Sequence, residues 1–203
     1  MSLGQLWTRL LCMLLAAFGM AGCAANGAGK LGRSAMFPPD VGWPGGLLVG
    51  AGEPPLWTSV ALQGFRSRWR VSIRGIARDR IIVRIDETSR GSISGTYIRY
   101  WKGDHRTDLR ERRSFRVTRK QLAELQALAK DRQILTAPRQ GWTLTDDEAM
   151  CLDGEEVLIE AVDAQGYRAA GANAQCTAPA GLLDVAAKII QLSGGRGLGL
   201  IGR

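Results

Sequence analysis

Residues 69–74 read Trp-Arg-Val-Ser-Ile-Arg, and this stretch decides the fold class because apolar and polar side chains alternate along it. Trp69, Val71 and Ile73 fall on one face of an extended chain, and the arginines and serine fall on the other. This period of two is typical of an antiparallel strand with one face on the core and one in water. We therefore expect basic side chains to line the solvated face of a sheet.

Further strands are expected where similar stretches stand between turn-rich or charged segments. Three to five of them should form a meander, and residues 102–113 are expected to be a very polar connection. Residues 163–166, Asp-Ala-Gln-Gly, are typical of a turn between the last two strands. The expected strands are residues 69–74, 80–86, 93–101, 114–117, 151–152, 156–162 and the stretch around Tyr167.

A first helix is expected to begin at Thr118, because Thr118 and Gln121 have the spacing of a capping box. Its apolar side chains recur at helical spacing, so one side of the helix should pack on the sheet. Pro138 lies beyond its expected end. The apolar stripe consists of Leu122, Leu125, Leu128 and Ala129.

A second helix is expected over residues 179–192, with Thr177 as its candidate cap. Pro179 falls in the first turn, where a missing amide proton is harmless, and Gly194 is the expected stop. The order of elements predicts an α+β fold: an antiparallel sheet of about five to seven strands with two helices packed on one face.

The domain organisation follows from composition. A single domain is expected over residues 56–194, because the chain is long enough for one core, and residues 195–203 are expected to be a disordered tail. Residues 23–55 are rich in Gly, Ala and Pro, which is typical of a tether. Apolar side chains at Phe37, Trp43 and residues 47–49 leave open whether part of this tether folds back on the domain or on a membrane surface.

The amino terminus has the layout of an export signal. A lone Arg9 precedes an apolar run over residues 10–22 that is too short to span a membrane. The segment Met20-Ala21-Gly22-Cys23 resembles the lipobox of bacterial lipoproteins, although Met20 replaces the usual Leu.

That resemblance implies cleavage after residue 22, so that residues 1–22 are a signal peptide, and acylation of Cys23 with palmitate-like chains. Two or more acyl chains anchor a protein stably. In the lipoproteins that the segment resembles, an Asp directly after the acylated cysteine is typical of proteins retained in the inner membrane. Ala24 stands at that position, which favours the outer membrane, facing the periplasm. The alternatives are an ordinary secretory leader cleaved near Ala25 and an uncleaved anchor.

Export places the remaining cysteines in an oxidising compartment. Cys12 belongs to the expected leader, which leaves Cys151 and Cys176 to form a disulfide. A metal or redox pair would need closer spacing or nearby histidines, and His105 is the only histidine in the chain. We expect no bound metal and no cofactor.

Charge is distributed unevenly. Residues 57–120 contain 17 Lys and Arg against 6 Asp and Glu, whereas residues 121–203 contain 7 against 11. Nucleic acid is the usual partner of a basic half, but an exported lipoprotein seldom meets it. We therefore expect anionic lipid headgroups, lipopolysaccharide phosphates or an acidic envelope protein as partners, and no nucleic acid. A solvated face without any partner is the alternative. The candidate binding surface is Arg70, Arg74, Arg84, Arg99 and Tyr100.

Short motifs resemble those of small domains of unknown function in bacterial exported proteins. The matching stretches are residues 69–73, Phe115-Arg-Val-Thr118, Cys151-Leu-Asp-Gly154, Tyr167 and Leu182-Leu183. The resemblance spans residues 57–193 and implies a fold, with no activity attached.

Candidate chemistry is weak. Two carboxylates of the acidic cluster Asp146, Asp147 and Glu148 could act as general acid and base. The alternative, which we favour, is an exposed acidic loop that leads into a strand. His105 lies in a polar turn, and no nucleophile motif accompanies it. We therefore assign no catalytic residue and expect a membrane-anchored periplasmic lipoprotein without enzymatic activity. The alternatives are an envelope hydrolase that uses the acidic loop and an accessory or inhibitor module for another exported protein.

Overall fold

The structure is a computed structural model that describes residues 48, 51–74, 79–102, 107–136, 139–140, 155–175, 178 and 181–195. The chain divides into two compact units, Met1–Met36 and Phe37–Arg203. All described residues belong to the second unit.

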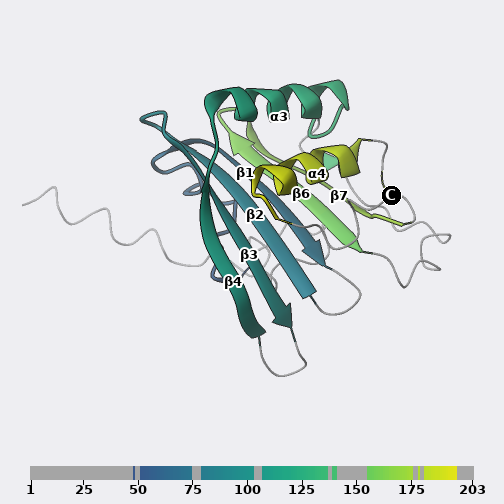
Figure 1. Ribbon diagram of the computed structural model, residues 1–203. Helices are drawn as coiled ribbons and strands as arrows, with labels where there is room; N and C mark the ends of the chain where they lie inside the picture. Colours follow the sequence, from purple (N-terminus) through teal and green to yellow (C-terminus); the bar gives the residue numbers. More distant parts are fainter. Residues whose placement is uncertain are drawn as a thin grey trace, which may run out of the picture. The chain divides into compact units, whose positions relative to one another are not determined.

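Within the described residues, one sheet of seven strands dominates the fold (Figure 1). Six strands pair antiparallel, and the two-residue strand β5 pairs parallel with β7. The strand order is β4-β3-β2-β1-β6-β7-β5, so the first four strands form the expected meander and β6 adds to the free side of β1. The strands are β1 (Phe65–Arg74), β2 (Asp79–Thr88), β3 (Ile93–Lys102), β4 (Thr107–Arg116), β5 (Arg139–Gln140), β6 (Glu156–Asp163) and β7 (Gly166–Asn173).

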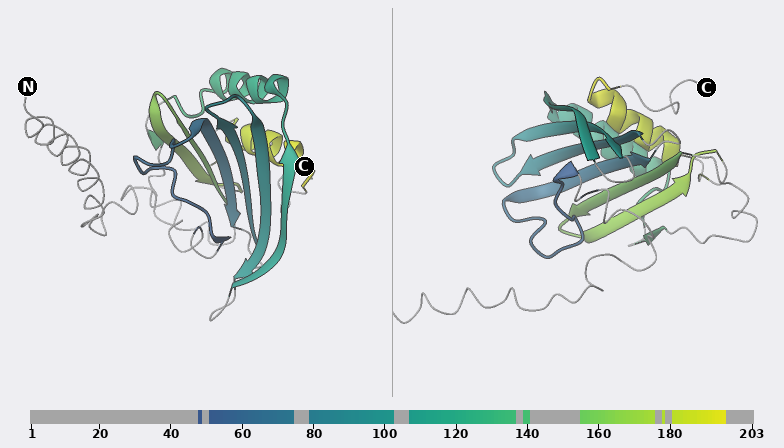
Figure 2. Two further views of the ribbon diagram at one scale, coloured as in Figure 1. Left: turned by 90° about the vertical axis from the view of Figure 1, so that its left-hand side faces the viewer. Right: turned by 90° about the horizontal axis from the view of Figure 1, so that it is seen from below.

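Two helices, α3 (Arg119–Asp131) and α4 (Leu182–Leu192), lie on one face of this sheet (Figure 2). They bury their apolar stripes against the inward side chains of the strands, which forms the main core. This core unites residues such as Val71, Leu125 and Ile189, all 0% exposed. The predicted α+β fold with two helices on one sheet face is confirmed.

The start of α3 is as the capping box predicts. The Gln121 backbone N–H donates to the Thr118 hydroxyl, and the Thr118 N–H donates to the Gln121 side chain at 2.8 Å. The two bonds satisfy amide groups that the first turn of a helix leaves without partners.

The start of α4 differs from the prediction. The helix is preceded by Gly181 with φ of 95°, so the cap position lies after the predicted Thr177, which is outside the described residues, and no described side chain caps the helix. Glycine adopts this left-handed conformation without strain. It also leaves room for the Arg132 side chain, whose Cβ would lie 2.6 Å from a Cβ at position 181.

Strand β4 is longer than predicted. It includes Thr107 to Arg113, which the sequence suggests as a polar connection. β4 is an edge strand with many exposed side chains, so it can pair with β3 without an alternating apolar pattern. Charged side chains on an edge also discourage pairing with other chains.

The opposite face of the sheet carries the amino-terminal part of the domain. Leu48 and Ala51 pack with Ile82, Ile98 and Tyr100 in a second apolar cluster. Leu56 and Ala61 form another with Val162. The segment runs along the sheet on the side away from the helices in both views of Figure 2. The domain therefore begins before residue 56, and the described part of the expected tether folds back on it.

Candidate functional site: the charged sheet face

The sheet face away from the helices carries an unusual number of ionic side chains, and we call it the charged face. Its rows follow from strand register, because residues paired across neighbouring strands share a face. One row contains Glu160, Arg70, Arg84, Thr96 and Ser114 in order from β6 to β4. The ionic residues of the face are Arg68, Arg70, Arg74, Arg80, Arg84, Asp86, Arg112, Arg116, Glu156 and Glu160.

Arg70 and Glu160 form a fully buried ion pair at the centre of this face. Both side chains are 0% exposed, and two parallel bonds of 2.6 and 2.8 Å join the guanidinium to the carboxylate. The third guanidinium nitrogen, Nη1, donates to the Pro54 carbonyl at 2.7 Å, and the Tyr167 hydroxyl donates to Glu160 at 3.0 Å. Each charge therefore has several partners, as burial requires.

A series of linked ion pairs extends across the charged face from β1 to β4. Arg68 Nε and Arg84 Nε each donate to Asp86 at 2.8 Å, one to each carboxylate oxygen. Arg84 Nη1 also donates to Glu53, whose other oxygen lies 3.4 Å from Arg112 Nη2. Burial lowers the pKa of Arg84, but the Glu53 and Asp86 carboxylates outweigh burial and hold that pKa above its usual value. The guanidinium therefore stays charged.

A third group of ionic side chains lies at the end of the charged face where β1 ends and β2 begins. Arg74 pairs with Glu156 across β1 and β6, and its side chain is 40% exposed. Burial raises the pKa of Glu156, and Arg74 partly opposes this rise. Burial likewise raises the pKa of Tyr100, which Arg80 opposes. Both shifts favour the neutral form of an acid in a dry environment.

The predicted binding surface is only partly assembled. Arg70, Arg74, Arg84 and Tyr100 share the charged face, but Arg99 pairs with Ile81 and Glu111 and so belongs to the other face, where it is exposed. The prediction that these side chains lie on a solvated face is wrong for Arg70 and Tyr100, which are 0% and 1% exposed. The reason is that described residues among 48 and 51–62 cover them and Glu160 on β6 supplies a buried counter-charge for Arg70. Arg74 and Arg99 remain accessible to a ligand.

The structure adds exposed arginines on β4 that the sequence prediction missed. Arg110 and Arg112 have side chains 57% and 44% exposed, and Arg116 is exposed as well. Leu109, beside them, is 58% exposed. We call Leu109, Arg110, Arg112 and Arg116 the β4 basic surface. The local excess of Arg is visible in the sequence. The strand was not predicted because residues 107–113 lack the alternation of apolar and polar side chains that indicates one.

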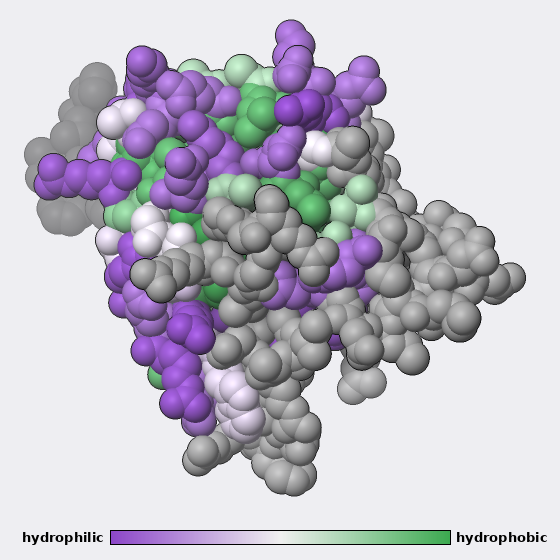
Figure 3. Space-filling view, turned by 45° about the vertical axis from the view of Figure 1, so that its right-hand side comes forward, coloured by the Kyte–Doolittle hydropathy of each residue, from purple (hydrophilic) through white to green (hydrophobic). Residues whose placement is uncertain are grey.

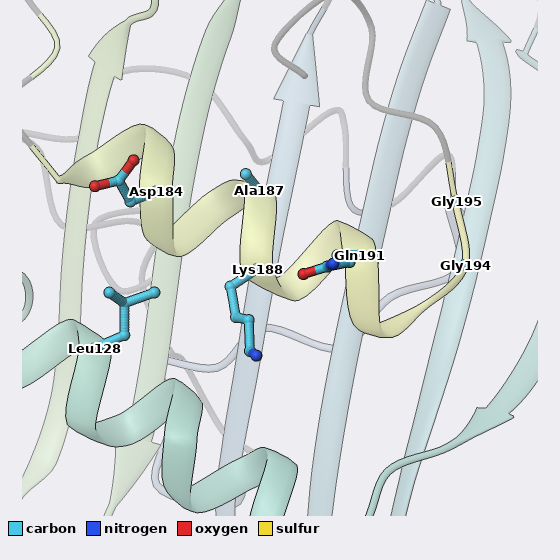
Figure 4. Close-up of a pocket in the computed structure, with 7 residues that line it drawn as sticks. All are labelled: Leu128, Asp184, Ala187, Lys188, Gln191, Gly194 and Gly195. Carbon is cyan, nitrogen blue, oxygen red and sulfur yellow. The ribbon is translucent and has the colours of Figure 1, made fainter. Parts of the chain in front are cut away.

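A groove of about 530 Å³ lies on the helix side, between α3 and α4 (Figure 4). Its charged side chains pair across the helices: Lys188 lies 3.1 Å from Glu124, and Asp184 lies 3.1 Å from Arg132. Apolar contact comes from Leu128 and Ala187. The charged side chains at the groove therefore pair with each other and link α3 to α4.

On the face shown in Figure 3, hydrophilic side chains (purple) cover much of the coloured surface, with apolar side chains (green) between them. Among the described residues, no group of His, Cys, Asp and Glu could hold a metal ion. No helix in that part of the chain is long and apolar enough to cross a membrane.

Several predicted residues lie outside the described parts of the chain. They are the lipidation residue Cys23, the predicted disulfide Cys151 and Cys176, the acidic residues Asp146, Asp147 and Glu148, His105, and all of the predicted tail except Gly195. Their roles stay predictions.

No protein-family model matches the chain, and no curated protein matches it either. The fold and site therefore define the protein in their own terms. It is an α+β domain whose sheet carries a main core on one face and a partly covered network of arginines and carboxylates on the other.

Proposed function

We propose that the protein is a non-enzymatic, lipid-anchored lipoprotein of the bacterial cell envelope, facing the periplasm, whose β4 basic surface contacts anionic lipid headgroups. The lipobox resemblance at Cys23 supports the anchor and the location. The exposure of Arg110, Arg112 and Arg116 beside the exposed Leu109 carries the proposal for the surface.

The composition of β4 suits a membrane surface. It holds four arginines against Asp108 and Glu111, so it is net positive. Arginine stems cover apolar surface while their guanidinium groups reach phosphate oxygens. Each basic side chain near an anionic bilayer contributes about 1 kcal/mol of attraction, and this attraction is screened by salt.

Vesicle binding tests the β4 basic surface. The chain from residue 24 onward keeps the whole compact unit and lacks the expected lipid site, so only the protein surface acts. We expect it to bind vesicles of equal parts phosphatidylglycerol and phosphatidylcholine at low salt and to ignore phosphatidylcholine alone. Arg110→Gln with Arg116→Gln should lower the partition coefficient about 30-fold, since two charges contribute about 2 kcal/mol together.

The matched control is Lys130→Gln with Lys188→Gln, which removes two charges from the helices. We expect a much smaller loss for this pair. Equal losses for both pairs would mean that only net charge matters, and equal binding to neutral and anionic vesicles would refute electrostatic binding altogether.

The covalent claims have their own test in the intact mass of the native protein. The mass should equal that of residues 23–203 plus a diacylglycerol and an amide-linked acyl chain, and Cys23→Ser should leave an uncleaved, unacylated precursor. Reduction should add about two daltons as one disulfide opens. A native mass that matches the full-length precursor would contradict the anchor.

A further inference from the structure

Glu53 is the one ionic residue that residues 48–62 bring to the charged face. Its side chain is 0% exposed, and its two oxygens are shared between Arg84 and Arg112. The Glu53 N–H donates to the Leu48 carbonyl at 2.9 Å, which holds the segment in a tight turn over the sheet. A carboxylate from the covering segment thus lies between two guanidinium groups of the sheet.

These two guanidinium groups have the arrangement of an anion site. Arginine is over-represented where proteins bind phosphate and carboxylate, because its guanidinium group donates two parallel charge-assisted hydrogen bonds to such anions. Arg112 is still 44% exposed, so solvent reaches one side of the pair while Glu53 fills the other. Without Glu53, Arg84 would keep only Asp86, which it shares with Arg68, and Arg112 would lose the carboxylate that it contacts at 3.4 Å.

The covering segment can leave without opening the main core. Leu48 and Ala51 belong to the second apolar cluster and Leu56 to another, whereas the helices pack in the main core on the opposite face. Displacement of residues 48 and 51–56 therefore exposes two small apolar clusters, breaks the hydrogen bond from Arg70 to the Pro54 carbonyl, and leaves the helix–sheet contacts in place. Local opening of this kind requires less free energy than global unfolding.

We propose that Arg84 and Arg112 form a binding site for a lipid phosphate, which Glu53 occupies in the free protein and vacates at an anionic membrane surface. The inference rests on the proposed function, because it takes the same headgroups as ligand. Glu53 then acts as a tethered competitor, whose high local concentration keeps the site closed to dilute anions.

The test compares two variants that each remove one negative charge, again in the chain from residue 24 onward. Glu53→Gln neutralises the competitor with nearly the same shape. Glu124→Gln is the matched control, since Glu124 is exposed and pairs with Lys188 on the helix side. We expect Glu53→Gln to bind phosphatidylglycerol vesicles at least about fivefold more tightly than Glu124→Gln, a typical coupling between linked equilibria. Adding Arg84→Gln should abolish the gain.

Hydrogen exchange of the unaltered chain gives a second readout that does not depend on a variant folding. The amide of Glu53 should exchange faster when anionic vesicles are added. The amide of Arg132, bonded to the Leu128 carbonyl at 2.9 Å at the end of α3, should not change. Unchanged protection at Glu53 in vesicle-bound protein would overturn the proposal.

Inorganic phosphate separates a lipid source from a free anion. If phosphate alone raises the melting temperature of Glu53→Gln, and vesicles give no gain over Glu124→Gln, the lipid is not the ligand and the proposal is overturned. If the unaltered chain binds anionic vesicles but Glu53→Gln and Glu124→Gln bind equally, this inference fails and the proposed function survives. If no form of the chain binds vesicles, both fail.

Discussion

Arg70→Met is expected to lower the free energy of unfolding by about 3–5 kcal/mol, because it leaves Glu160 buried without its cation. Glu160 is 0% exposed and would keep only the Tyr167 hydroxyl as a partner of those described. The Pro54 carbonyl would lose its guanidinium donor at the same time. Urea unfolding with an unchanged slope would attribute the loss to the folded state.

Two comparisons make this expectation specific to the buried pair. Arg66→Met changes the same residue type on the same strand, but the Arg66 side chain is 58% exposed and lies 4.0 Å from Glu87, so its effect should be below about 1 kcal/mol. The double variant Arg70→Met with Glu160→Leu should recover most of the loss, since it leaves no unpaired charge. If Arg70→Met were no more harmful than Arg66→Met, the pair would not be buried as described.

Leu125→Ala should have the second large effect, a loss of about 2–5 kcal/mol. Leu125 is 0% exposed, and α3 contributes only Leu122, Leu125 and Ala129 as buried residues, so the helix depends on few side chains. The large cavity that this change leaves cannot be filled by a neighbouring residue of the same helix without shifting it.

Gln126→Ala is the control for this prediction, because Gln126 follows Leu125 on the exposed side of α3. We expect it to change the free energy of unfolding by less than about 0.5 kcal/mol. Thermal unfolding followed by circular dichroism would measure both variants. Equal melting temperatures for Leu125→Ala and the unaltered chain would contradict the packing of α3 on the sheet.

Local patterns in the sequence predicted most of the secondary structure. The alternation around Trp69 identified β1, and the Thr118 and Gln121 pair identified the start of α3, because both signals depend only on neighbours in the chain. The turn at residues 163–166 is confirmed by the β6–β7 hairpin, in which Gly166 has φ of 102°. The start of α4 was missed because a glycine in the left-handed conformation carries no side-chain signal.

The candidate site was harder to predict, because its partners come from distant parts of the chain. Arg70 and Glu160 are separated by 90 residues, and only the β1–β6 pairing joins them. An arginine at an outward position of a strand looks solvated until its cover is known. That cover, residues 48–62, includes part of a Gly- and Pro-rich stretch whose composition is typical of a tether.

The pairing of β1 with β6 also affects the order in which the protein can fold. When the chain folds from its amino-terminal side, β1 to β4 come first, and β1 has an open edge until residues 156–163 join the sheet. Until then the unpaired backbone of β1 and the apolar underside of the meander are exposed, which is the condition that favours aggregation. A chain that stops before β6 should therefore need a chaperone to remain soluble, and α4 can complete the core only after β6 and β7 have joined the sheet.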